Sequence, residues 1–109
     1  MQREKPLILL VDDDTDIIEF LSYSLKQNDF LVESVYNGLD AITKAKEIIP
    51  DIILLDVMMP KMDGMETCSN LRNIKELNDT MIVFLTARGE DYSQIDGFER
   101  GADDYIAKP

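Results

Sequence analysis

The sequence predicts an α/β fold in which a doubly wound parallel sheet carries helices on both faces. Short apolar runs, typical of strands buried on both sides, alternate along the chain with segments whose apolar residues recur at helical spacing. Residues that favour turns and helix caps stand between these segments. Such alternation implies right-handed crossovers that connect parallel strands within one sheet.

Five strands are expected. Three are continuous apolar runs, at Leu7–Val11, Ile52–Leu55 and Met81–Leu85. A weaker strand is expected at Leu31–Val35, and a short last one at Tyr105–Ala107. The apolar runs are bounded by polar residues, which indicates that those strands lie in the middle of the sheet.

Helices are expected between the strands, because apolar residues there share one helical face. The three faces consist of Ile17, Leu21 and Leu25; of Ala41, Ala45 and Ile48; and of Met65, Cys68, Leu71 and Ile74. The expected boundaries are Asn37-Gly38 before the second helix, Pro50 after it, Asp63-Gly64 before the third, and Gly101 after Phe98 at the end of a fourth.

Length and composition limit the class of protein. The 109 residues suit one domain with one aliphatic core. With 11 basic and 22 acidic residues the net charge is -11, which disfavours binding of this domain to nucleic acid or to anionic membranes. Cys68 is the only cysteine and histidine is absent, so neither an internal disulfide nor a zinc site is expected. We expect a cytoplasmic domain without a signal peptide or membrane span.

Polar residues follow the expected strands where the chain leaves the sheet. Asp12-Asp13-Asp14 ends the first strand, Asp56 the third and Thr86 the fourth, and the last strand runs into Lys108. In open α/β sheets, ligands bind outside the carboxyl ends of the strands. Converging carboxylates without histidine or cysteine favour magnesium, or alternatively manganese.

This set of residues also suits a phosphoryl group attached to Asp56. A metal would cover some of the phosphoryl oxygens, Lys108 would contact another, and Thr86 would donate a hydrogen bond to a third. The sequence therefore predicts a phosphoryl site at this edge of the sheet.

Four motifs, LILLVDDD, IILLDVMMPKMDG, VFLTARGED and GADDYIAKP, resemble the receiver domain of bacterial two-component response regulators. The resemblance covers essentially the whole chain and implies a flavodoxin-like sheet of order 2-1-3-4-5. It also implies that Asp56 accepts a phosphoryl group from the phosphohistidine of a sensor histidine kinase. The module would then be a phosphoacceptor switch that catalyses its own phosphotransfer and dephosphorylation, rather than an enzyme.

The resemblance also implies a role for each site residue. Asp13 and Asp56 would bind the metal directly, together with the backbone carbonyl of Met58, and Asp12 would act through water. Lys108 would contact the phosphoryl group and couple it to the last strand.

Thr86 and Tyr105 resemble the switch pair, in which the hydroxyl moves toward the phosphoryl group and the ring turns inward. The small side chain of Ala87 would leave access to the acceptor. Met58 and Arg88 occupy the positions at which phosphoryl lifetime is tuned.

The region from Ala87 onward resembles receivers of the winged-helix transcription-factor class. In that class phosphorylation favours a homodimer through the fourth helix and the last strand, and Arg100, Asp103 and Asp104 would lie on or near that face. The family continues through a fifth helix, so we expect a chain truncated at Pro109 whose output domain is not present. Such a chain should be less stable, or associate more readily, than one extended by that helix.

Several alternatives compete with these roles. An isolated Asp after a strand more often caps the next helix, and Asp14 is expected to do so, alone or with Thr15. A calcium loop starting at Asp12 is excluded because Ile17 replaces the turn glycine. A haloacid-dehalogenase phosphatase would need a threonine in the fifth position of DxDxT, which Asp16 occupies. A degenerate receiver that acts as a constitutive interaction module remains the main alternative.

Overall fold

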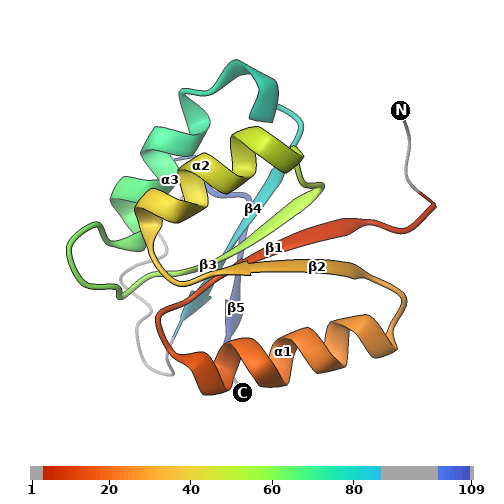
Figure 1. Ribbon diagram of the computed structural model, residues 1–109. Coiled ribbons are helices and arrows are strands. Elements are labelled where there is room, and N and C mark those ends of the chain that lie inside the picture. The colour runs from red at the N-terminus through yellow and green to blue at the C-terminus, as the bar shows by residue number, and fades with distance from the viewer. Residues whose placement is uncertain (1–3, 87–100, 109) are drawn as a thin grey trace.

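A computed structural model describes residues 4–86 and 101–108 of the chain. The elements follow in the order β1 (Leu7–Val11), α1 (Thr15–Gln27), β2 (Leu31–Val35), α2 (Gly38–Ile48), β3 (Ile52–Asp56), α3 (Gly64–Arg72), the 3-10 helix η1 (Lys75–Leu77), β4 (Met81–Thr86) and β5 (Asp104–Ala107). The strands form one parallel sheet of order β2-β1-β3-β4-β5 (Figure 1). The predicted fold class and strand order are therefore confirmed.

The strand register brings the carboxyl ends of the strands to one edge of the sheet. Val11 pairs with both Val35 and Leu55, while Thr86 pairs with Ala107. In parallel strands such a register aligns the residues that follow each pairing. The polar residues that end β3 and that come directly after β1 and β5 are thus placed near one another.

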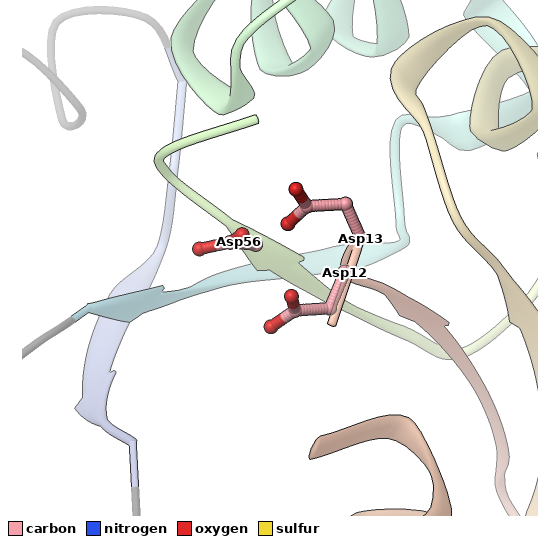
Figure 2. Close-up of side chains that lie close together, drawn as sticks. All are labelled: Asp12, Asp13 and Asp56. Carbon is pink, nitrogen blue, oxygen red and sulfur yellow. The ribbon is translucent and has the colours of Figure 1, made fainter. Parts of the chain in front are cut away.

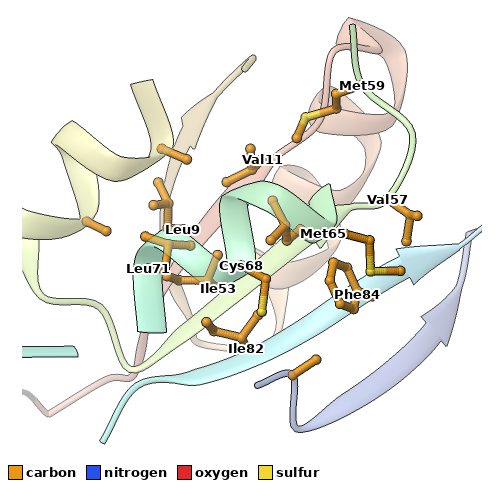
Figure 3. Close-up of a cluster of buried hydrophobic side chains, with 14 of the residues drawn as sticks. Leu9, Val11, Ile53, Val57, Met59, Met65, Cys68, Leu71, Ile82 and Phe84 are labelled. Atoms are coloured by element: carbon orange, nitrogen blue, oxygen red, sulfur yellow. The ribbon is translucent and has the colours of Figure 1, made fainter. Parts of the chain in front are cut away.

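Helices cover both faces of the sheet. Figure 1 shows α1 on one side and α2 with α3 on the other. Because successive strand residues point to opposite faces, Leu9 and Val11 join the cluster under α2 and α3 (Figure 3), whereas Ile8 and Leu10 join the cluster that packs with α1. Burial on both faces explains why the central strands are continuous apolar runs.

The helix starts are capped by side chains that the sequence supplies. The Asp14 carboxylate accepts hydrogen bonds from the backbone amides of Asp16, at 2.9 Å, and Ile17, at 3.4 Å. Asn37 caps α2 and Asp63 caps α3 in the same way. Each cap contributes roughly 1 kcal/mol to helix stability. The predicted capping role of Asp14 is confirmed.

Some details differ from the prediction. The most deeply buried residue of α1 is Ile18, whereas Ile17 is only half-buried. Ile18 lies three and seven positions before Leu21 and Leu25, so these three side chains share a face more closely than a set that begins at Ile17. Ile74 lies beyond the end of α3 but still packs against the core.

The predicted fourth helix lies outside the described residues. Among the helices that the structure does describe, none has the length and apolar character that crossing a membrane requires.

Candidate functional site

Three carboxylates converge at the carboxyl edge of the sheet. Asp12 and Asp13 follow β1, and Asp56 is the last residue of the neighbouring strand β3. Figure 2 shows the three side chains directed toward a common space, where each offers an oxygen within 4.8 Å of the others. The structure thus brings together the three acids that the sequence predicts to form one site.

Two of these carboxylates are buried. Asp12 is 0% and Asp56 2% exposed, whereas Asp13 is exposed. Asp12 Oδ1 accepts a hydrogen bond from the amide of Asp14 at 2.9 Å, and Asp56 Oδ1 accepts one from the amide of Met58 at 3.4 Å. Among the described residues, the buried Asp56 Oδ2 has no hydrogen-bond partner. Such an atom is costly unless a ligand satisfies it.

Lys108 joins the two buried acids. Its Nζ lies 3.0 Å from Asp12 Oδ2 and 3.0 Å from Asp56 Oδ1, and its backbone amide donates to the carbonyl of Thr86 at 2.8 Å. One ammonium therefore neutralises part of the charge of two carboxylates. The sequence predicted a contact between Lys108 and a phosphoryl group, but it did not predict this direct bridge between the acids.

The electrostatics of the cluster follow from burial and charge. Burial raises the pKa of Asp56 to about 7; the hydrogen bond from Lys108 opposes this shift and the charge of Asp12 adds to it. Burial lowers the pKa of Lys108, but its hydrogen bonds to Asp56 and Asp12 outweigh that effect and the net pKa is raised. The ammonium thus stays charged near neutral pH, where Asp56 changes its charge.

The donor set fits a hard divalent cation. Asp12, Asp13 and Asp56 offer oxygen atoms only, which suits Mg²⁺ or Mn²⁺ rather than zinc. The buried Asp56 oxygen without a partner is an atom that such a cation would satisfy. A second positive charge would also reduce the repulsion between the two buried acids.

Gly64 fixes the loop that follows Asp56. A Cβ atom built on Gly64 would lie 2.2 Å from the carbonyl oxygen of Asp56 and 2.8 Å from Cα of Val57. The Gly64 amide also donates to the Val57 carbonyl at 2.9 Å. The sequence identified this glycine only as a helix boundary, because an Asp-Gly pair does not indicate which backbone approaches it.

The predicted switch residues lie on the neighbouring strands. Thr86 ends β4 at the same edge of the sheet and is half-buried. The Tyr105 ring on β5 packs on Phe84, with ring centroids 5.5 Å apart and planes at 39°. Thr86 and Tyr105 thus lie on the two paired strands β4 and β5, the second of which leads to Lys108.

For the remaining predicted site residues, the structure describes Met58 but not Ala87, Arg88 or Arg100. Met58 is 65% exposed in the loop after β3, and the role of its carbonyl stays a prediction. Ala87, Arg88 and Arg100 lie outside the described residues.

Comparison with known proteins agrees with this geometry. The family model described as the response regulator receiver domain matches residues 8–109. The transcriptional regulatory protein ResD of Bacillus subtilis is 44% identical over 99% of this chain and 44% of its own length. A CpxR homolog of Haemophilus influenzae is 46% identical over 94% of this chain and 43% of its own. The chain thus spans less than half the length of these relatives.

Solved structures of response regulators have folds similar to that of this chain. A putative response regulator from Chloroflexus aurantiacus has a TM-score of 0.92 and 34% identity, covering 97% of this chain and 87% of that one. DrrB of Thermotoga maritima, described as an OmpR/PhoB homolog, has a TM-score of 0.82 and 34% identity, covering 96% of this chain and 46% of its own.

Proposed function

We propose that this chain, which belongs to the response regulator receiver family, is a phosphorylation switch whose acceptor is Asp56. The predicted resemblance to this family, and to regulators of the OmpR/PhoB class, is confirmed. A receiver domain is a phosphoacceptor signalling module rather than a conventional enzyme. The observation that carries the proposal for Asp56 is its burial at the sheet edge beside two further acids and Lys108.

The transfer step assigns a part to each residue. A carboxylate oxygen of Asp56 attacks phosphorus, the bond from phosphorus to the histidine nitrogen of the donor breaks, and an aspartyl phosphate forms. The ammonium of Lys108 shifts from the carboxylates to a phosphoryl oxygen and neutralises part of its charge. The shift is short, since Nζ already lies 3.0 Å from Asp56 Oδ1. The hydroxyl of Thr86 donates to another phosphoryl oxygen. The domain in this way assists its own phosphorylation and dephosphorylation.

The acidic cluster is a site for Mg²⁺, with Mn²⁺ as a substitute. Asp12, Asp13 and Asp56, with the backbone carbonyl of Met58, would hold the cation. When bound, the cation supplies positive charge that offsets the charge of the phosphoryl oxygens. The residues of the chain orient the acceptor and keep most of its carboxylate away from water.

The family indicates the partner. A receiver domain of a two-component system implies a sensor histidine kinase as phosphoryl donor. The relatives that match are transcriptional regulators, so we place the domain in the cytoplasm upstream of a transcriptional output. The domain itself would not contact DNA, because its net charge of -11 repels phosphates.

The output step is a population shift. Contacts of Thr86 with the phosphoryl group would favour one arrangement of the Phe84–Tyr105 pair and of the strand that carries it. That arrangement would favour a homodimer through the fourth helix and the last strand. Met58, Ala87 and Arg88 would control access to the acceptor and phosphoryl lifetime.

Incubation with acetyl phosphate, with and without Mg²⁺, tests the proposal by intact mass. We expect one added phosphoryl group that depends on Mg²⁺ and is lost in Asp56→Asn. Asp79→Asn is the matched control, since Asp79 is an exposed acid in the turn before β4 and its loss should change nothing. The absence of an adduct on the unsubstituted chain would instead support a degenerate receiver that acts as a constitutive interaction module.

A further inference from the structure

Among the described residues, strand β5 leads to Lys108 and has less apolar burial than the central strands. Within residues 4–86 and 101–108 it is a four-residue edge strand whose one partner is β4. Tyr105 packs against the core, whereas Ile106 is 49% exposed. Apolar burial, which contributes about 25 cal/mol per Å², therefore holds this strand less strongly than the central ones.

The guanidinium of Arg72, at the end of α3, makes polar contacts with three residues in two segments, the 3-10 helix η1 and the stretch that leads into β5. Its Nε donates to the carbonyl of Gly101 at 2.8 Å, and one Nη donates to the carbonyl of Leu77 at 3.1 Å. The other Nη lies 2.6 Å from the carboxylate of Asp103. The planar fork of an arginine suits this multiple recognition, which a lysine cannot reproduce.

Asp103 extends this network to β4. The same carboxylate oxygen, Oδ2, accepts the amide of Ile82 at 2.8 Å, and the Asp103 amide donates to the Ile82 carbonyl at 2.8 Å. The resemblance places Asp103 near a dimer face, yet this oxygen is already engaged within the chain. We call Arg72, Gly101 and Asp103 the β5 clasp.

Gly101 allows the close approach that the clasp requires. Its φ is 101°, in the left-handed region that favours glycine. A Cβ atom on Gly101 would lie 2.5 Å from Cγ of Arg72. A larger residue would therefore push the entry of β5 away from the arginine.

We propose that Arg72 is a positioning residue for phosphoryl transfer, which acts by holding the amino end of β5 so that Lys108 is presented at the other end. This inference rests on the proposed function. The strand between them pairs with β4 from Asp104 to Ala107, and the Lys108 amide continues the ladder to Thr86. Fixing one end of so short a strand thus restricts the other, where Nζ contacts both buried acids.

The test compares Arg72→Gln and the milder Arg72→Lys with the unsubstituted chain. We expect phosphorylation by acetyl phosphate to slow by about tenfold in Arg72→Gln and by less in Arg72→Lys, since small displacements of a reacting group are costly. Mg²⁺ affinity, followed by titration, should not fall, because the three acids lie at the ends of β1 and β3 and a displaced Lys108 competes less with the cation. Deuterium exchange should increase at residues 104–108 and not in β1.

Two controls separate positioning from general stability. Lys44→Ala removes another cation that pairs with two acids, Glu33 and Glu47, and should leave the rate unchanged. In a Lys108→Ala background the additional loss from Arg72→Gln should disappear, because the residue through which Arg72 acts is absent.

Equal fold-losses with and without Lys108 would overturn the proposal and leave Arg72 as a residue of the fold alone. Unchanged exchange in β5 would overturn it as well. If the unsubstituted chain accepts no phosphoryl group, the proposed function fails, and the exchange measurement then decides on its own whether the clasp holds β5.

Discussion

The central strands and the edge strand β5 contribute to the same site but are held in different ways. β1 and β3 lie between two apolar clusters and carry the three acids at their ends. Among the described residues β5 has less apolar burial, follows a segment that Arg72 holds by polar contacts, and leads to Lys108. The acids that would bind the cation therefore sit on the part with the most apolar packing. The Lys108 ammonium and the Tyr105 ring, which are expected to respond to phosphorylation, belong to β5 and the residue after it, where apolar packing is weaker.

Removing apolar side-chain volume should cost more stability in β3 than in β5. Ile53→Ala in β3 should destabilise the domain by about 3 kcal/mol, because it leaves a cavity where the side chain is fully buried. Ile106→Ala in β5 should cost less than about 1 kcal/mol, since that side chain is half exposed. Denaturant unfolding measures both values, and similar losses at the two sites would contradict the difference drawn between these strands.

The free energy of unfolding should depend on pH because Asp56 is buried. The pKa of Asp56 is raised from 3.8 to about 7 in the folded, metal-free chain, so between these values the folded state binds a proton that the unfolded state has lost. The contribution of Asp56 to stability should thus be present at acidic pH and be lost as the pH rises toward 7. Urea unfolding at pH 5 and pH 8 should show this decrease relative to Asp56→Asn. Parallel pH profiles of the two proteins would exclude it.

Removing Asp13 should affect the cation more than the fold. The Asp13 side chain is exposed, and it supplies one of three converging carboxylates. Asp13→Ala should weaken Mg²⁺ binding by about tenfold, corresponding to about 1.4 kcal/mol, with little change in unfolding free energy. Calorimetric titration with Mg²⁺ gives the affinity. Unaltered binding would remove Asp13 from the cation site.

Removing Lys108 should raise the affinity for Mg²⁺, whereas removing Asp13 should lower it. Its ammonium lies 3.0 Å from both buried acids and competes electrostatically with Mg²⁺. Lys108→Ala should tighten Mg²⁺ binding by about threefold to tenfold while slowing phosphorylation. The same titration, compared with Lys44→Ala, measures the effect. Weaker binding than in the unsubstituted chain would show that Lys108 supports the cation site instead of competing for it.

The two regions also differ in how far the sequence predicts them. The central strands and the convergence of Asp12, Asp13 and Asp56 could be predicted, since apolar runs mark buried strands and parallel strands end at one edge. The clasp could not, because Arg72 and Asp103 are 31 positions apart and neither lies in a periodic pattern. Contacts between polar side chains that are far apart in the sequence produce no periodic pattern by which one sequence could predict them.

Asp56, and not another acid of the cluster, is the residue proposed to carry the phosphoryl group. Borohydride reduction after phosphorylation converts the modified aspartate to homoserine, which peptide mass analysis can locate. We expect homoserine at Asp56 alone, and only when Mg²⁺ and the phosphoryl donor are both present. Homoserine at Asp12 or Asp13, with Asp56 unmodified, would contradict the proposed acceptor.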